Sequence, residues 1–416
     1  MNILIDFKIL TNSKKKYRMS KENFMTNRKH SACIVGIGQT PYKRWGAVTE
    51  ESEFSLACKA IMAAAEDAGL PLSEIDGFSA HSDDRNDPAR LEVTLGIKQL
   101  RLATMVWGGG GGGASASLSH AVAAVENGTA NYVVVLRALC QGQQFRYGQF
   151  HEWSAHQKFA SPYGLFSPPG QAALTFRRYM HRYGLTEEKL ARVALACRAN
   201  ANRNPNAVMY EKPLDLETYL SGRMIADPYR VYDCCLETDG ACALIVTTRE
   251  RAADLRGKPA HILAVGQGGD GRWGTGNFGN YNMPEEIFSI GPQKRLADEL
   301  FARAGIERSD VDVAQIYDAF SGGVITTLEA FGFCGLGEAG DFAADGNLDW
   351  PNGGLPINTA GGLLSEAYVH GLNLLVEGVR QIRGESTSQV EDTKICLVTA
   401  AAVTPTSATL LGKEPS

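Results

Sequence analysis

The sequence has little of what marks several common protein classes. In 416 residues it has no apolar run close to the roughly 20 residues that a membrane-spanning helix needs. Its nine cysteines are scattered without a Cys-x-x-Cys spacing, which argues against both a zinc site and a disulfide framework. It also lacks His-Glu-x-x-His and Gly-x-Ser-x-Gly, the patterns of zinc proteases and of hydrolases with a nucleophile elbow. These absences predict a cytoplasmic protein with reduced thiols, without a membrane span and without a metal.

Outside the N-terminus, acidic residues outnumber basic ones. Residues 1–30 carry eight Lys and Arg side chains against two acids, although the whole chain has a net charge of −5. The rest of the chain is therefore acidic, whereas nucleic-acid phosphates require a basic surface. We expect no nucleic-acid partner, and we expect the basic leader, residues 1–30, to be disordered or absent from the native chain.

The remaining sequence alternates strand-like and helix-like segments. Ala32–Ile37 and Tyr132–Leu136 are short apolar runs typical of buried strands. Glu53–Ala68 and Ser115–Glu126 place small or apolar residues at helical spacing, and the first of these helices is expected to end at Gly69. Strands that alternate with helices predict a mostly parallel sheet covered by helices.

A faint internal repeat indicates a duplicated α/β fold. Residues 64–77, which end a helix at Ala-Gly and continue through a Ser-acid-apolar-Asp turn, have a counterpart at 302–313. Further along the chain, 110–136 is echoed by 361–398. Two matches in the same order are harder to attribute to chance than either match alone.

These patterns predict an N-terminal half over 31–255 and a C-terminal half over 256–416. The first half contains an insertion at about 140–220 that is rich in aromatic residues and in turn residues such as Pro168-Pro169-Gly170, which predicts an irregular loop domain. Insertions of this length are usually lids or binding loops, although packing against a second subunit is an alternative. Its aromatic residues would suit a bulky apolar substrate such as a steroid nucleus.

Two glycine-rich segments resemble nucleotide-binding motifs but lack their context. Gly108–Gly113 is not followed by the Lys-Ser/Thr of a phosphate-binding loop, and Gly274-x-Gly276-x-x-Gly279 is not followed by a helix start. Glycines 108–113 lie before a predicted helix, where backbone N–H groups can bind an oxyanion. A tight crossing of two buried backbones explains the same glycines equally well.

Taken together, the segments resemble the thiolase superfamily, specifically its sterol-carrier-protein-like, lipid-transfer branch. The resemblance covers about residues 32–412 and is carried by stretches that are specific only in combination: Ala68–Gly77, Met224–Pro228, Thr238–Ala241, Tyr317–Ser321 and Asn358–Gly362. It implies a duplicated thiolase fold of five layers, α-β-α-β-α, that acts as a homodimer.

The chain departs from that superfamily at the positions that react. The place of the nucleophilic cysteine falls on Gly111, and that of the second cysteine falls on Ala400. Neither residue can form an acyl-enzyme, so the resemblance does not extend to the covalent thiolase mechanism. Two further positions, which in thiolases lie together beside the thioester carbonyl, carry Tyr317 and Tyr368. Gly371 matches the last glycine of the superfamily's Gly-His-Pro-x-Gly motif. This alignment places Tyr368, and not His370, at the position of the motif's histidine.

The loss of both cysteines and the gain of two tyrosines resemble the thiolase-like steroid side-chain aldolases. These enzymes cleave a β-hydroxyacyl-CoA into a ketone and a shorter acyl-CoA, together with a small OB-fold partner of the DUF35 type. A retro-aldol reaction needs a base for the β-hydroxyl, stabilisation of the thioester enolate and an acid for the α-carbon. A phenol, with a pKa of about 10, can act as base or acid if its surroundings shift that pKa.

The resemblance therefore implies a carbon–carbon lyase that acts on a steroid side-chain thioester such as a 17-hydroxy C22 steroid acyl-CoA. Tyr317 and Tyr368 are the predicted catalytic residues, and the sequence does not decide which is the base. Gly111, Gly112, Gly362 and Ala402 are predicted to bind the substrate or its enolate oxygen, with Gly111 leaving the space that a cysteine side chain would fill. No cofactor is expected beyond the coenzyme A of the substrate, and the expected assembly is a hetero-tetramer with the DUF35 partner.

Two other functions remain open at the level of sequence. A non-catalytic subunit that binds acyl-CoA or lipid for a partner enzyme explains the missing nucleophile equally well, but it gives no reason for Tyr368. A Claisen-type transferase would need another thiol. The thiols nearest to the matching segments, Cys140 and Cys334, do not align with the reactive cysteine positions of the superfamily.

Overall fold

We analysed a computed structural model of the chain. It describes residues 31–81, 84–106, 110–143, 146, 158, 160–165, 167–269, 284–401 and 405–415. Four features singled out above fall outside the described residues: the leader 1–30, glycines 108 and 109, the Gly274–Gly279 motif and Ala402.

Within the described residues, ten strands form one large mixed sheet with two similar parts. The N-terminal part has the strand order β4 (Leu102–Met105), β3 (Gly77–Ala80), β5 (Val133–Leu139), β8 (Thr238–Thr248) and β1 (Ala32–Gln39). Strand β3 pairs with β4 and with β5 in parallel, whereas β8 pairs with β5 and with β1 in antiparallel. The short strand β2 (Lys43–Arg44) pairs with β8.

The C-terminal part repeats this arrangement, which confirms the predicted duplication. Its order is β9 (Ala260–Gly268), β12 (Thr406–Gly412), β11 (Ile395–Thr399) and β10 (Val313–Gln315). The three pairings are antiparallel, antiparallel and parallel, as in β1, β8, β5 and β3. The expectation of a mostly parallel sheet is wrong, because the long strands β8 and β12 return through each part in the antiparallel direction.

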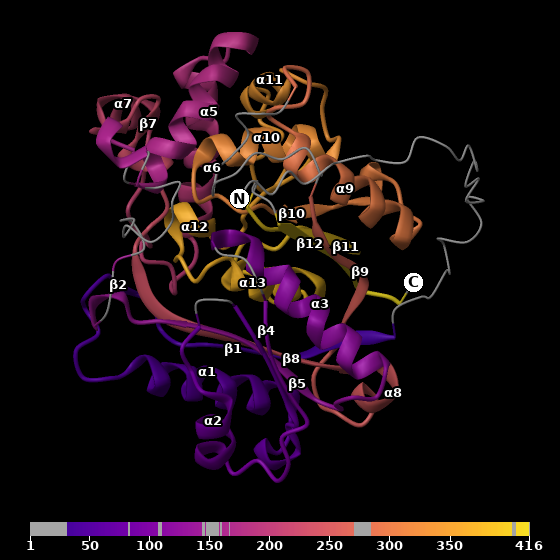
Figure 1. Cartoon of the computed structure of the whole chain (residues 1–416). Coiled ribbons are helices and arrows are strands. Elements are labelled where there is room, and N and C mark those ends of the chain that lie inside the picture. The colour runs from indigo at the N-terminus through magenta and orange to yellow at the C-terminus, as the bar shows by residue number, and fades with distance from the viewer. Residues whose placement is uncertain are drawn as a thin grey trace, which may run out of the picture.

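Helices cover both outer faces of the sheet and also fill the space between its two parts (Figure 1). On the N-terminal side, α1 (Glu53–Ala68) packs against β1, β5 and β8, and α2 (Pro88–Leu95) lies beside β3, β4 and β5. The middle layer consists of α3 (Gly113–Glu126) and α13 (Leu372–Arg383), whose buried residues contact strands from both parts. On the C-terminal side lie α9 (Gly291–Ala304) and α10 (Ser321–Phe331). These are the five layers that the thiolase resemblance implies.

The repeated turns explain why the two parts fold alike. Helix α1 ends at Gly69 and α9 ends at Gly305, both in the left-handed conformation that glycine adopts without strain. The carboxylates of Asp76 and Asp312 then each accept two backbone N–H bonds, at the beginning of β5 and of β11 respectively. Each aspartate therefore links, through hydrogen bonds, the turn after a connecting helix (the end of a crossover) to the neighbouring strand.

The predicted irregular insertion at about 140–220 is largely helical where it is described. It contains α5 (Pro168–Tyr183), α6 (Glu187–Ala201) and α7 (Leu216–Ser221), and β6 (Met224–Ala226) and β7 (Tyr229–Arg230) follow. The Pro-Pro-Gly that reads as a turn begins a helix instead, because the first turn of a helix needs no N–H from its prolines.

Two aromatic residues of this insertion belong to the hydrophobic core, and the proposed role of the others in binding an apolar substrate stays a prediction. Phe176 and Tyr179 are only 3% and 0% exposed and belong to the core around α6, α9 and α10. Their rings pack on each other, with 5.4 Å between ring centroids. Six other aromatics fall outside the described residues: Phe145, Tyr147, Phe150, Trp153, Phe159 and Phe166.

Short elements complete the described fold: η2 (Leu72–Glu74), η3 (Gly110–Gly112), η4 (Gln141–Gln143), η5 (Ser161–Tyr163), η6 (Val231–Asp233), η7 (Arg308–Asp310), α8 (Arg249–Ala252), α11 (Ala339–Ala344) and α12 (Gly362–Ser365). All nine cysteines are free thiols, as their spacing predicts. Among the helices of the described ranges, none combines the length and the apolar character that crossing a bilayer would demand.

Candidate active site

The two tyrosines singled out by the sequence meet in the structure. Tyr317 follows β10, and Tyr368 lies in the connection between α12 and α13. Their hydroxyl oxygens are 3.1 Å apart, and the Tyr317 hydroxyl donates to that of Tyr368. The rings are nearly perpendicular, at 72°. Tyr317 is 4% exposed, whereas Tyr368 is half-buried.

The space beside Gly111 is filled, contrary to the expectation that it stays open. A Cβ at Gly111 would lie 1.9 Å from Cζ and 2.2 Å from the hydroxyl oxygen of Tyr317. On another side of the same ring, a Cβ at Gly371 would lie 2.9 Å from Cδ2 of Tyr317. The phenol of Tyr317 has therefore taken the volume of the missing side chain, and two glycines make room for it.

Gly111 and Gly112 form the turn η3 that leads directly into α3. The Gly111 carbonyl accepts a hydrogen bond from the Ala401 N–H at 3.2 Å, and the Gly112 carbonyl accepts one from the Ser407 hydroxyl at 2.6 Å. These bonds fix the turn to the C-terminal half. The positive end of the α3 dipole therefore lies beside the Tyr317 hydroxyl, where it favours negative charge.

Gly362 is held by a neighbour of the tyrosine pair rather than by the pair itself. It has φ of +62°, and a Cβ there would lie 2.3 Å from Asp318 Oδ2. The Asp318 carboxylate accepts the N–H groups of Leu363 and Leu364 at 2.8 and 3.1 Å. Burial raises the pKa of Asp318 to about 6, against the effect of these two bonds. The predicted substrate contact of Gly362 stays a prediction.

A buried cation next to Tyr368 was missed by the sequence analysis. Arg137, on β5, is 1% exposed, and its Nε donates to Nδ1 of His370 at 2.9 Å. Its Nη1 lies 3.5 Å from Asp84 Oδ2. The His370 ring stands at 85° to the Tyr368 ring, with 5.0 Å between centroids. The signal was present in the sequence, because an arginine inside a buried apolar strand needs a partner.

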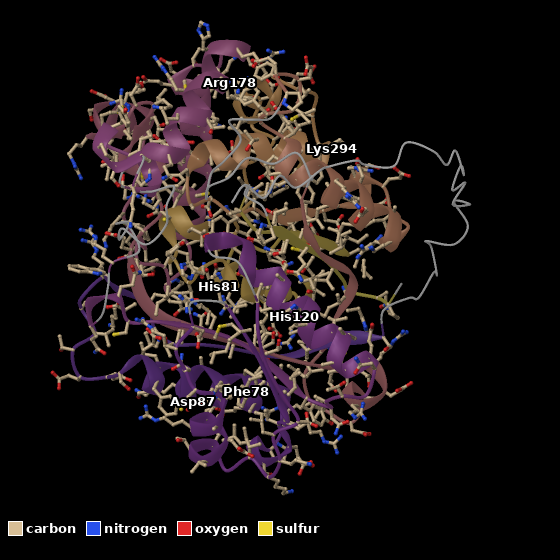
Figure 2. All side chains as sticks on the ribbon, in the orientation of Figure 1. Phe78, His81, Asp87, His120, Arg178 and Lys294 are labelled. Atoms are coloured by element: carbon tan, nitrogen blue, oxygen red, sulfur yellow. The ribbon has the colours of Figure 1, made fainter. Side chains whose placement is uncertain are left out.

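The imidazole of His81 completes this environment. It lies near the centre of the molecule, as Figure 2 shows, and stacks on His370 with 4.7 Å between ring centroids. A Cβ at Gly113, the first residue of α3, would lie 2.3 Å from Cδ2 of His81. His81 therefore links the beginning of α3 to the histidine that contacts Tyr368.

Burial and a nearby cation act in opposite directions on the pKa of both phenols. Burial is the main cause that raises the pKa of Tyr317 and of Tyr368 above the ordinary value, and the Arg137 cation opposes this effect on both. The pKa of His370 is well below its ordinary value, because of burial, the Arg137 charge and His81. Arg137 is therefore the positive charge that favours a phenolate at both positions, and the hydrogen bond with Tyr368 adds to this effect at Tyr317.

The thiols do not supply a replacement nucleophile. Burial raises the pKa of Cys140 to about 11 and that of Cys334 to about 12. Cys235, which influences the titration of both tyrosines, has a pKa well above the ordinary value for the same reason. A protonated thiol is a poor nucleophile, so these residues do not support a Claisen-type transferase. No cluster of potential metal ligands occurs among the described residues.

Comparisons with known proteins show which family this chain resembles. A family model described as thiolase C-terminal domain-like matches residues 283–411. The chain is 39% identical to a 17-hydroxy-3-oxo-4-pregnene-20-carboxyl-CoA lyase from Mycobacterium tuberculosis, with 92% of this chain and 99% of that protein covered. It is 40% identical to a steroid side-chain-cleaving aldolase from Thermomonospora curvata, with 92% and 98% covered. Among solved structures, the Ltp2–ChsH2(DUF35) aldolase matches with a TM-score of 0.85 and 39% identity, over 92% of this chain and 98% of that chain.

Proposed function

Because this chain belongs to the family of thiolase-like, steroid side-chain-cleaving aldolases, we propose that it is a carbon–carbon lyase acting on a β-hydroxyacyl-CoA. The proposed products are a ketone and a shorter acyl-CoA. The similar lyase from M. tuberculosis is named for a 17-hydroxy steroid carboxyl-CoA, which supports a 17-hydroxy C22 steroid acyl-CoA as the substrate here. The proposed reaction needs no cofactor besides the coenzyme A of the substrate.

One observation carries the proposal: two phenol hydroxyls 3.1 Å apart lie where a thiolase-like fold would otherwise hold its nucleophile. In the proposed reaction one tyrosine, as phenolate, removes the proton of the β-hydroxyl. The bond between the α- and β-carbons breaks, its electron pair forms the enolate of the shorter thioester, and the β-carbon becomes the carbonyl of the ketone. The other tyrosine then protonates the α-carbon.

The hydrogen bond between the tyrosines accounts for how the site returns to its starting state. After one turnover the base has gained a proton and the acid has lost one. Because the two oxygens are in direct hydrogen-bond contact, the proton can pass back without solvent. The positive end of α3 beside Gly111 and Gly112 would stabilise the enolate oxygen during the reaction.

The test is product analysis by mass spectrometry, with the partner protein present and candidate β-hydroxyacyl-CoAs as substrates. We expect Tyr317→Phe and Tyr368→Phe each to lower kcat by about 100-fold or more, since each removes one proton-transfer group. The matched control is Tyr219→Phe, a buried tyrosine whose hydroxyl bonds to Asp233 instead. Full turnover by both site variants contradicts the proposal, and tight acyl-CoA binding without product favours the non-catalytic subunit.

We also propose that the chain acts as a homodimer that assembles with a small DUF35-type OB-fold protein into a hetero-tetramer. The similar solved structure is named as an aldolase with a DUF35 component, which supports such a partner. A cytoplasmic location would agree with the nine free thiols. Native mass spectrometry of the co-expressed proteins measures the stoichiometry, and a complex without two copies of each chain contradicts this part of the proposal.

A further inference from the structure

Four polar side chains form a buried cluster directly behind Tyr368. The Arg137 cluster consists of His81, Asp84, Arg137 and His370, which are 2%, 6%, 1% and 2% exposed. The first three come from the N-terminal half, whereas His370 comes from the C-terminal half together with Tyr368. A buried charge pair is costly to desolvate, and apolar replacements are often as stable. Stability alone therefore does not explain why this cluster stands beside the tyrosine pair.

The cluster controls a strained turn. His370 has φ of +49°, a conformation that costs a residue with a side chain roughly 1 kcal/mol or more, and Gly371 follows with φ of +83°. The 2.9 Å bond from Arg137 Nε to His370 Nδ1 holds the imidazole of this turn in place. The turn begins with Tyr368, and its last residue, Gly371, lies so near the ring of Tyr317 that a Cβ there would be 2.9 Å from Cδ2. The conformation of residues 368–371 therefore sets the distance between the two hydroxyls.

The cluster also sets the charge at the site. Because His370 Nδ1 accepts from Arg137, its ring proton lies on Nε2 and the ring is neutral. Burial and the Arg137 charge keep the pKa of His370 well below its ordinary value, so it adds no second cation. The titratable groups that influence the two phenols are, besides each other, Cys235, Asp318 and Arg137. Of these, only Arg137 is positive.

We infer that Arg137 and His370 are positioning residues for the tyrosine pair. Arg137 clamps the imidazole of His370 so that the turn presents the Tyr368 hydroxyl to Tyr317, and its fixed charge stabilises the phenolate that acts as the base. This inference rests on the proposed retro-aldol function.

The decisive experiment compares Arg137→Met and Arg137→Lys in the complete complex, using the dependence of kcat on pH. For Arg137→Met we expect kcat to fall about 10- to 100-fold and KM to stay within about twofold. The pH at which the rate rises on loss of a proton should move up by about one unit or more. Arg137→Lys keeps the charge, so its pH profile should stay near that of the wild type while kcat falls. The matched control is Arg383→Met, which removes a buried guanidinium paired with Asp67 and should leave the profile unchanged.

The turn is tested separately at His370. Asparagine tolerates a positive φ and offers an oxygen that accepts from Arg137, whereas valine does neither. We therefore expect His370→Asn to retain most of kcat and His370→Val to lose it, with acyl-CoA binding similar in both. Equal activity of the two variants, or an unchanged pH profile in Arg137→Met, overturns the inference.

A readout without turnover separates this inference from the proposed function. Ultraviolet difference titration of tyrosinate, wild type against Tyr368→Phe, follows the phenols whether or not product forms. In the Arg137→Met background the same titration should occur at higher pH. A shifted titration in a protein that makes no product supports the role of Arg137 and contradicts the lyase. An unshifted titration in an enzyme that forms product contradicts the role of Arg137 and supports the lyase.

Discussion

At position 111 the backbone and the ring of Tyr317 compete for one small volume. A Cβ there would stand 1.9 Å from Cζ of the ring, which is far inside van der Waals contact. The absence of a side chain at Gly111 and the presence of a phenol at Tyr317 are thus one coupled change. The sequence alone reveals both residues but not that each requires the other, because 206 positions separate them.

This coupling predicts the behaviour of Gly111→Ala. Forcing a methyl group into the occupied volume should cost about 1–3 kcal/mol of unfolding free energy and displace the Tyr317 hydroxyl, so that activity is lost. In a Tyr317→Ala background the volume is vacated, and the same substitution should then cost less than about 0.5 kcal/mol. A double-mutant cycle by denaturant unfolding measures the difference. Equal costs in the two backgrounds would contradict the coupling.

At the scale of elements, each crossover ends in a turn whose aspartate ties it to the neighbouring strand. Asp76 is 6% exposed and accepts the backbone N–H groups of Asn131 and Tyr132, the latter at 2.8 Å. The Ser-acid-apolar-Asp pattern indicated such a turn at both places, but the N–H groups that the carboxylate accepts are 55 and 56 residues away. Local sequence therefore predicted the turn and not its function as a tie between strands.

Loss of this tie should affect stability and not chemistry. We expect Asp76→Ala to lower the unfolding free energy by about 1–3 kcal/mol, because two buried N–H groups lose their acceptor. The kcat of the folded fraction should stay unchanged. Asp254→Ala, at an exposed position, serves as the control and should change stability by less than about 0.5 kcal/mol. Urea unfolding measures both, and equal effects would count against the tie.

At the scale of the whole molecule, buried polar groups as well as apolar ones join the two halves. Glu366 is 0% exposed and accepts hydrogen bonds from Asn373 at 3.0 Å and Asn204 at 3.4 Å. Burial raises the pKa of Glu366 to about 8, although the Arg380 charge acts in the opposite direction. The folded protein therefore holds a proton here that the unfolded chain releases near its ordinary pKa of about 4.5.

The linkage of this proton to folding gives a pH dependence with a definite sign. Between the unfolded and the folded pKa the native state binds the extra proton, so the stability contributed by Glu366 is fully present below about pH 4.5 and is lost as the pH rises towards about 8. Glu366→Gln removes this proton and should flatten the decline of the unfolding free energy over that range. Urea unfolding at a series of pH values checks this, and an unchanged slope would refute it.

Features that depend on neighbours along the chain could be predicted from the sequence. Helix α1 was predicted to the residue, because its apolar spacing and Gly69 are local signals, and the repeat of two turns indicated the duplicated fold. The same locality explains the error at α5, because Pro-Pro-Gly is compatible with a turn as well as with the start of a helix.

Features that depend on contacts between distant segments could be identified only in the folded chain. The antiparallel return of β8 and β12, the phenol that fills the space at Gly111 and the cation behind Tyr368 each join residues far apart in the sequence. Hydrophobic periodicity indicates which residues are buried but not which buried residues meet. The reactive pair could be named from sequence, whereas the charge that tunes it required the fold.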